Sequence, residues 1–397
     1  NTDWYIKQLR DQWSHESAPL PISLTDEEVE RVTAGISQWQ PQDIEIPVDK
    51  EMLKKAFSDD RNYKENIGVK PDTSLSIFQN GIDFEIPVDS LDNTVSWRLN
   101  GRRYGQDQQG NTVYYLQVQD RLILDMLRTN NWLRPVYFAN TVSSTSQLGL
   151  QKYFRTEGKA YRVVPKEFGN SGQDNINVDI MTDRLKKFQF REWNNPDVYF
   201  DENIRRMLSN YRFNFMSLAE EYRSQGMPDS ASYWLKWGEE RIPFRPDETN
   251  ESIKLLYAVR YAQAGSPDDA LRLAGESESD IIQDLDYNLA RFTELENEFN
   301  MLNQEFESAR NQGNIRLQRE LRPELQQLNN QARNFLTEVR MARQSLVLVQ
   351  YVYYQAGETE TALELKSKVD DMMGAGFPEM PGTRAESEQE ITRYGIN

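Results

Sequence analysis

Three segments in the second half of this sequence share one spacing of a tyrosine, a glycine and an alanine. They are Tyr222-x3-Gly226-x4-Ala231, Tyr261-x3-Gly265-x4-Ala270 and Tyr353-x3-Gly357-x4-Ala362. In each segment the aromatic residue would end one helix, the glycine would form the turn, and the alanine would let the next helix pack closely against the first. This pattern is typical of tetratricopeptide hairpins, so we predict a degenerate, tetratricopeptide-like set of helical repeats.

The stretch between the second and third segments has a different pattern. Its apolar residues recur in steps of three and four, which is the heptad spacing of a coiled coil. They are Phe292, Leu295, Phe299, Leu302 and Phe306, followed by Leu325, Leu328, Ala332, Phe335, Val339 and Ala342. The polar residues 311–314 lie between the two runs, so we predict an antiparallel coiled-coil hairpin inserted into the repeats. We expect Pro323 to start or kink the second arm.

The first half of the chain has shorter periods. Apolar residues alternate with polar ones, or form short runs, in stretches that read as strands: 43–49, 94–99, 113–118, 132–139 and 161–165. The stretch 120–129 has helical spacing instead. We therefore predict an α+β protein, in which a small N-terminal α/β domain precedes an all-α tetratricopeptide-like repeat domain with the inserted coiled-coil hairpin.

These patterns suggest five regions. The predicted ranges are 1–195 for the α/β domain, 196–284 for the first helical hairpins, 285–344 for the coiled-coil hairpin, 345–374 for the final repeat hairpin, and 375–397 for a C-terminal tail. Because the chain from Gly374 onward is rich in proline, glycine and charged residues, we expect it to lie over the surface or to be mobile.

Composition excludes several kinds of site. The chain has no cysteine and a single histidine, His15, which rules out disulfides, thiolate zinc sites and multi-histidine metal sites. A net charge of −17 argues against nucleic acid or an anionic lipid surface as a partner, because binding to phosphates needs clustered lysine and arginine. The glycine-rich phosphate loops and the nucleophile elbow are also missing from the sequence. We therefore assign no catalytic, cofactor-binding or metal-binding residue and expect no cofactor.

Aromatic clusters are the remaining candidates for a ligand or docking surface. The candidate residues are Trp4, Tyr5, Trp132, Arg134, Tyr137, Trp234 and Trp237. Aromatic rings can stack on sugars or anchor a protein partner. Packing in the core is the alternative role, since several of these residues flank a predicted buried strand or lie on a repeat helix.

Hydropathy predicts no membrane span in this chain. Its longest uncharged apolar stretch, 345–357, has thirteen residues, whereas a spanning helix needs about 20. The sequence starts at Asn1 rather than at methionine, so we expect it to be processed or excerpted from a longer protein.

Several local motifs resemble one family of membrane proteins. They occupy residues 1–6, 19–24, 46–50, 130–139, 148–150, 157–165, 195–203 and 206–212. In this order they resemble the segment that follows the last membrane helices in the DUF2723 family. These large multi-pass proteins are abundant in Bacteroidetes and are related to the TMEM-type protein O-mannosyltransferases of animals.

The resemblance implies a membrane-embedded glycosyltransferase half upstream that uses a lipid-linked sugar donor. It implies that this chain lies on the periplasmic side of the inner membrane, tethered through that upstream region. The implied partners are the upstream membrane domain of the same polypeptide and an acceptor or other protein bound by the helical repeats. The catalytic acid of such enzymes belongs to the membrane half, so the resemblance transfers no catalytic residue to this chain.

Three functions therefore stay open. The first is a non-catalytic acceptor-binding or docking module of a membrane glycosyltransferase. The second is a stand-alone repeat scaffold for protein–protein interaction. The third is a glycoside hydrolase that uses an acidic pair, with Asp49, Asp89 and Asp125 as candidate carboxylates.

Overall fold

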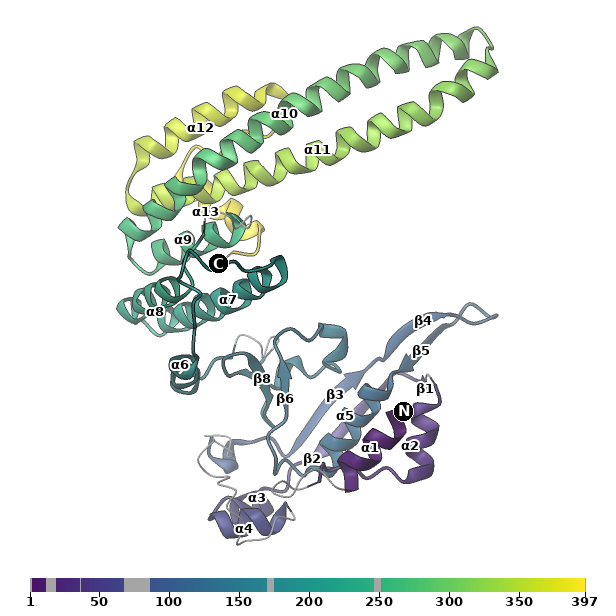
Figure 1. Ribbon diagram of the computed structural model, residues 1–397, viewed down its shortest axis with the longest axis vertical. Coiled ribbons are helices and arrows are strands. Elements are labelled where there is room, and N and C mark those ends of the chain that lie inside the picture. The colour runs from purple at the N-terminus through teal and green to yellow at the C-terminus, as the bar shows by residue number, and fades with distance from the viewer. Residues whose placement is uncertain are drawn as a thin grey trace. The chain divides into compact units, whose positions relative to one another are not determined.

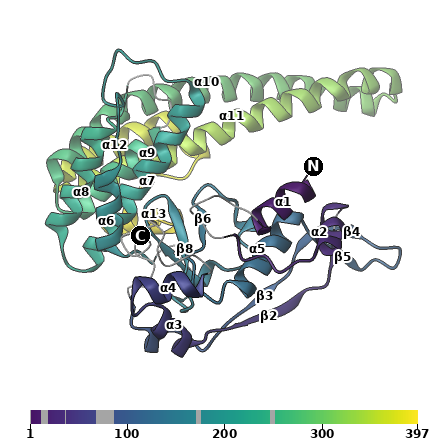
Figure 2. The same ribbon diagram turned by 60° about the horizontal axis from the view of Figure 1, so that its bottom comes forward.

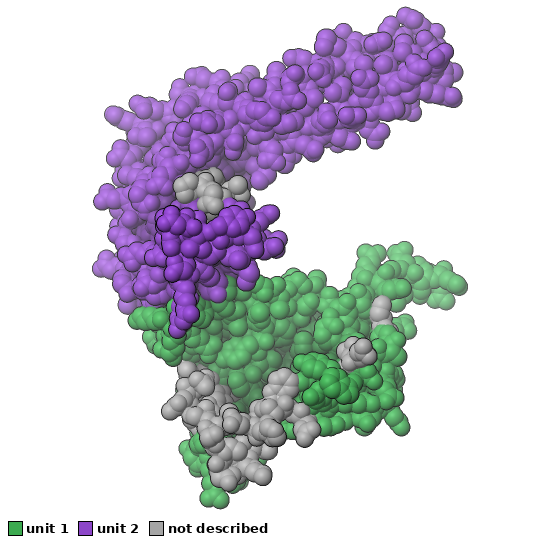
Figure 3. Space-filling view, in the orientation of Figure 1, with its two compact units in different colours: residues 1–188 green, residues 189–397 purple. Residues whose placement is uncertain are grey.

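The structure is a computed structural model, shown in two views (Figure 1, Figure 2). It describes residues 2–11, 19–35, 37–67, 86–169, 175–245 and 251–396. The chain divides into two compact units, Asn1–Phe188 and Gln189–Asn397 (Figure 3). His15 lies outside the described residues.

The first unit mixes short helices with small antiparallel sheets. Its helices are α1 (Thr2–Asp11), α2 (Asp26–Thr33), α3 (Lys50–Ala56), α4 (Asp60–Asn66), α5 (Val118–Thr129) and α6 (Val178–Lys187). Its strands are β1 (Ser37–Trp39), β2 (Gln42–Pro47), β3 (Thr94–Leu99), β4 (Arg102–Gln106), β5 (Thr112–Leu116), β6 (Tyr137–Ala139), β7 (Phe154–Thr156) and β8 (Ala160–Val163). They form three sheets, ordered β1-β5-β4, β2-β3 and β6-β8-β7, with antiparallel neighbours throughout. The predicted mixture of helices and strands is confirmed.

The β2–β3 pair shows how alternation in the sequence sets the pairing. Ile44 and Ile46 are buried, while the residues between and around them are exposed. They lie opposite Trp97 and Val95, which are buried on β3. A shift of one residue would turn the isoleucines to solvent, so burial of one face specifies this register.

Three buried tryptophans join the parts of this unit. Each indole Nε1 donates a hydrogen bond to a backbone carbonyl that lies far away in the sequence. The pairs are Trp39 to Leu99 at 2.9 Å, Trp97 to Leu148 at 2.7 Å, and Trp132 to Pro47 at 3.1 Å. An indole can be buried at low cost only when its N–H finds such a partner, so these bonds connect loops to sheets across the core.

The strand predicted over 132–139 is wrong in its first part. Only Tyr137–Ala139 forms a strand. Asn131 and Trp132 have φ values of 48° and 61°, in the left-handed region. These two residues turn the chain after α5, and a left-handed turn directs the Trp132 ring into the core. The apolar run signalled burial correctly but did not reveal the turn.

The described part of the second unit is helical throughout apart from its connections. Its helices are α7 (Glu202–Ser224), α8 (Pro228–Arg241), α9 (Glu251–Gln263), α10 (Pro267–Asn311), α11 (Ile315–Ala356), α12 (Thr359–Met373) and α13 (Arg384–Arg393). The C-terminal part of α11 forms the centre of the second unit. Its residues 346–354 are all buried, and α9, α10, α12 and α13 all contact this helix. The predicted all-helical second half is confirmed.

The three repeated segments form the three expected helix–turn–helix connections. Gly226, Gly265 and Gly357 follow α7, α9 and α11 with φ values of 75°, 75° and 88°. This conformation strains any residue with a Cβ atom. The alanine of each segment is fully buried in the following helix: Ala231, Ala270 and Ala362.

The predicted hairpin is the outer part of two long helices. α10 and α11 run side by side and antiparallel to a turn at residues 312–314 (Figure 1, Figure 2). Each arm and the segment at its base belong to one continuous helix, α10 or α11. α11 begins at Ile315 and runs through Pro323, so Pro323 does not start it. Pro323 is exposed, and water can satisfy the carbonyl that its missing N–H would have bonded.

The residues after Gly374 pack against the second unit. Met380 and Ile391 are buried, and α13 contacts α11. The Arg343 guanidinium on α11 donates to the carbonyls of Pro378 and Glu379, at 3.0 and 2.5 Å. The expectation of a surface-lying or mobile end therefore misses a helix and its anchoring arginine.

Candidate functional site: an arginine-lined pocket between α2 and α5

The residues predicted as a docking surface do not share one environment. Trp4 and Tyr5 on α1 are 66% and 50% exposed, as a binding surface would require. Trp132 is buried in the core. Arg134 is half-buried and donates from Nη1 to the Pro19 carbonyl at 2.6 Å. These contacts give Trp132 and Arg134 structural roles in the first unit.

Tyr137 is 36% exposed, and its hydroxyl joins a buried charge network. Its Oη donates to Glu157 Oε2 at 2.9 Å, and burial raises the pKa of this phenol. The Glu157 carboxylate is buried and also accepts from Arg155 at 2.5 Å and Arg184 at 2.9 Å, with Arg162 at 3.8 Å. Charges this deeply buried persist only when they are paired and hydrogen-bonded. The motif at residues 157–165 therefore builds the β7–β8 hairpin and its surroundings.

Trp234 and Trp237 lie on α8 in the second unit, within an aromatic cluster that includes side chains of α7. Their ring centroids are 5.2 Å apart, and Trp234 is buried. The Arg241 guanidinium lies 3.5 Å from the centroid of the Trp237 ring. Phe190 and Phe215 also contact Trp237. Packing thus accounts for Trp234, while Trp237 is half-buried beneath an arginine.

The three candidate carboxylates of a hydrolase each hold a structural contact. Asp49 caps α3 by accepting from the Met52 amide at 2.9 Å. Asp89 pairs with Lys54 at 2.7 Å. Asp125 accepts two hydrogen bonds from Ser23. Each carboxylate thus contacts a different partner, and none of these contacts joins two of the three carboxylates.

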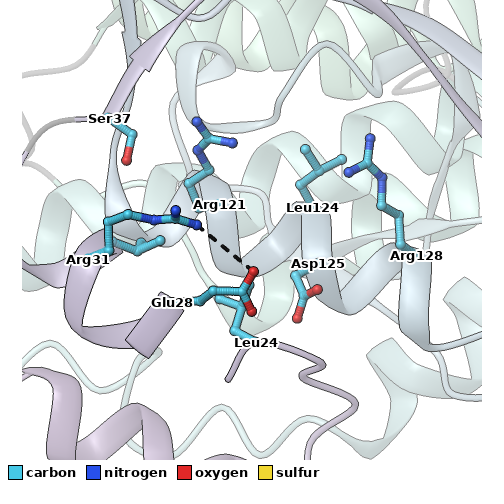
Figure 4. A pocket seen from close by; sticks show the side chains of 9 residues that line it. Leu24, Glu28, Arg31, Ser37, Arg121, Leu124, Asp125 and Arg128 are labelled. Atoms are coloured by element: carbon cyan, nitrogen blue, oxygen red, sulfur yellow. Dashed lines mark ion pairs between the residues drawn. The ribbon is translucent and has the colours of Figure 1, made fainter. Parts of the chain in front are cut away.

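A pocket that no local sequence motif indicates lies between α2 and α5. It has a volume of about 460 Å³, and side chains of α2, α5 and β1 line it. Its lining residues are Leu24, Glu28, Arg31, Val32, Ser37, Arg121, Leu124, Asp125 and Arg128. Arg121, Leu124, Asp125 and Arg128 follow one another at steps of three, one and three, so they share one face of α5. Figure 4 shows Arg121 and Arg128 projecting on either side of Leu124.

The pocket concentrates positive charge. Three arginines line it, and burial together with the charges of Arg31 and Arg128 lowers the pKa of Arg121. The Arg121 guanidinium lies 5.0 Å from the centroid of the Trp39 ring, and its buried Nε has no hydrogen-bond partner among the described residues. Arg31 reaches Glu28 at 3.9 Å (Figure 4). This arrangement suits a negatively charged ligand.

The sequence holds part of this signal. Arg121 and Arg128 are seven residues apart on a predicted helix, with Asp125 between them, which places all three on one face. The third arginine, Arg31, comes ninety positions earlier and joins the pocket only through the packing of α2 against α5. No local pattern in the sequence relates these two helices.

The described residues hold no group of three or more histidine, cysteine, aspartate or glutamate side chains that could bind a metal ion. In the same ranges, no helix combines the length and the apolar character that crossing a bilayer requires.

Comparison with known proteins gives one match. Residues 1–181 match the family described as TMEM260-associated domain 2. No curated protein matches the chain, and no solved structure does. The match agrees with the resemblance to TMEM-type O-mannosyltransferases over the first unit, while membership of the DUF2723 family and the tetratricopeptide character of the repeats remain predictions.

Proposed function

We propose that this chain is a non-catalytic, extracytoplasmic module of a TMEM260-like membrane glycosyltransferase. The observation that carries the proposal is the match of residues 1–181 to a TMEM260-associated domain. In this proposal an upstream membrane region of the same polypeptide transfers the sugar from a lipid-linked donor. The present chain, tethered at the periplasmic face of the inner membrane, binds the acceptor protein or docks it.

The helical unit supports a protein-binding role. We propose that 196–284 and 345–374 are tetratricopeptide-like hairpins, because their turns and buried alanines follow that pattern. The α10–α11 hairpin exposes large apolar side chains along its length and at its tip. These are Tyr287, Met301, Ile315 and Met341, each more than half exposed. Exposed apolar side chains on a long helix pair offer a surface that a protein partner can bury.

The test compares the membrane protein with and without residues 1–397. Loss of glycan transfer, or a change of acceptor, is expected when the module is removed. Unchanged transfer and unchanged acceptor choice would contradict the proposal.

A second variant asks whether the hairpin is the docking surface. Deleting 291–304 and 322–335 removes fourteen residues from each arm, which keeps the heptad phase and the turn. The ring contact of Tyr287 with Phe335 and the cation–π contact of Arg291 with Phe335 show that these segments face each other. We expect this variant to fold and to bind the acceptor more weakly, because it removes Met301 and shortens the surface that carries the exposed apolar side chains. The matched control is the M301L/M341L double variant, which keeps both side chains apolar and should bind as the wild type does.

A stand-alone scaffold is the second candidate, and the same exposed apolar side chains favour it. In that case a pull-down with the full chain recovers a stable partner, and deletion of the gene leaves protein glycosylation unchanged. A glycosylation defect upon deletion would decide for the first proposal.

A further inference from the structure

We propose that the pocket between α2 and α5 binds a ligand that carries a phosphate group, held by Arg31, Arg121 and Arg128. The site does not depend on the proposed function. It is inferred from the side chains of the first unit and can be tested on the isolated chain.

The two acids of the pocket are already engaged. Asp125 accepts from the Ser23 amide at 2.7 Å and from the Ser23 hydroxyl at 2.5 Å. Glu28 accepts from the Thr25 amide at 2.9 Å in the capping box of α2, and these hydrogen bonds with Thr25 hold the pKa of Glu28 low. Both carboxylates therefore serve the local backbone, and only Arg31 reaches one of them, at 3.9 Å.

Arg121 and Arg128 have no carboxylate partner among the described residues. Neither forms an ion pair within 4.0 Å there, although the chain has 63 acidic residues against 46 basic ones. Unpaired arginines on one face of a helix repel each other, and burial of Arg121 strengthens that repulsion. An anion between them would remove this cost.

Phosphate fits this arrangement for three reasons. A guanidinium presents its N–H donors in a planar fork that matches phosphate oxygens in a bidentate manner. The two unpaired arginines match the charge of a phosphate monoester, which is close to −2 at neutral pH. The Ser37 hydroxyl lines the same pocket and offers a neutral donor. A pocket of about 460 Å³ leaves room for a sugar or glycerol group beside the phosphate.

The test measures phosphate binding to the full chain by calorimetry, at an ionic strength kept constant with sodium chloride. The wild type should bind inorganic phosphate saturably. R121Q and R128Q should each weaken binding by about tenfold, or about 1.4 kcal/mol, because each removes a charge-assisted contact to the phosphate. R103Q is the matched control, since Arg103 is an exposed arginine of the same unit outside the pocket. R128Q changes an exposed side chain and should fold normally, so it carries the test if loss of the Arg121–Trp39 contact unfolds R121Q.

Two further probes identify the source of the phosphate. Glycerol 3-phosphate represents a soluble monoester, and phosphatidylcholine vesicles with or without phosphatidic acid represent a lipid headgroup. If either probe binds more tightly than inorganic phosphate, and this binding is about tenfold weaker in R128Q but unchanged in R103Q, the result supports the site and identifies its ligand class. Absence of saturable phosphate binding, or equal binding by wild type, R121Q and R128Q, would overturn it. Neither result affects the glycan-transfer test of the proposed module.

Discussion

The phenol of Tyr257 on α9 donates a hydrogen bond to the Leu235 carbonyl on α8, with 3.1 Å between Oη and the carbonyl oxygen. This contact exists because residue 238, one helical turn further along α8, is glycine. A Cβ atom added to Gly238 would overlap the Phe215 ring and would lie 2.6 Å from Tyr257 Oη. The helices α7, α8 and α9 therefore meet at a position that only glycine can occupy without displacement.

We expect Gly238→Ala to destabilise the second unit by about 1–3 kcal/mol, the usual cost of overpacking a filled core. This sign is opposite to the helix propensity of alanine, which favours the substitution by up to about 1 kcal/mol. Urea unfolding followed by circular dichroism gives the free-energy change. Gly275→Ala is the control, because Gly275 is exposed in α10 with open space around its Cα atom, and there we expect a gain in stability. Equal effects of the two substitutions would contradict the packing argument.

The first unit offers a second stability test at Asp120. This buried carboxylate accepts from the Arg102 guanidinium at 3.0 Å and from the Gln117 amide at 3.0 Å, so it joins β4 to the start of α5. Its hydrogen bond raises the pKa of Arg102. Asp120→Asn keeps the shape but removes the charge, and we expect a loss of about 2 kcal/mol because a half-buried arginine then lacks its anion.

The comparison for Asp120 is Asp43→Asn. Asp43 and Arg98 form a pair at 3.4 Å in which both side chains are more than half exposed. Solvent screens such a pair, so its loss should change the free energy of unfolding by less than about 0.5 kcal/mol. Thermal unfolding of both variants compares the stability lost with the buried pair to the stability lost with the exposed pair. A smaller loss for Asp120→Asn than for Asp43→Asn would contradict the prediction that the buried pair contributes more.

Local signals predicted the helical half well. The turn at Gly226 needs only a tyrosine, a glycine and an alanine close together in sequence, and all three positions behave as the spacing indicated. The heptad pattern likewise gave the facing arms of α10 and α11. The pattern does not indicate how far each helix extends beyond the hairpin, because heptad spacing marks the facing stripe of a helix and not where the helix begins.

Local sequence patterns do not indicate which distant segments contact each other. The chain turns between β3 and β4 at Gly101, which has a φ of 75°, yet β3 pairs with β2 and not with β4, because the hydrophobic faces of β2 and β3 match. The left-handed φ of Trp132 depends on a hydrogen bond to Pro47, which lies 85 residues away. The α2–α5 pocket was missed for the same reason, since Arg31 meets Arg121 and Arg128 only in the folded unit.

The burial of Lys159 predicts that the stability of the folded chain depends on pH. Burial lowers the pKa of this lysine to about 8, from 10.5 for an ordinary lysine. Between these pH values the unfolded chain binds a proton that the folded chain has released, so stability rises with pH across this window. Lys159→Met removes the effect. We expect the variant to be more stable than the wild type at pH 7, with a difference that shrinks between pH 8 and 10.5. Urea midpoints of both proteins across this range provide the measurement, and a difference that does not change with pH would contradict the assignment.

The contacts of Arg343 predict how the C-terminal residues are attached to α11. Besides the carbonyls of Pro378 and Glu379, its guanidinium pairs with Glu390 on α13 at 2.6 Å, and Arg343 itself is buried. Arg343→Met keeps most of the side-chain volume but removes three hydrogen bonds and leaves Glu390 without this cation. We expect residues 377–396 to detach locally, with a cost of about 2–4 kcal/mol for that segment.

Limited proteolysis measures this detachment. Chymotrypsin should cleave Arg343→Met near Phe377 much faster than the wild type, because cleavage follows the population of the open segment. The rest of the second unit should keep its helical circular dichroism, because α9, α10 and α12 still pack against α11 when α13 detaches. Arg340→Met is the matched control, because Arg340 is an exposed arginine one helical turn away on α11. If both variants are cleaved at the wild-type rate, the segment after Gly374 is held by the burial of Met380 and Ile391 and not by the arginine.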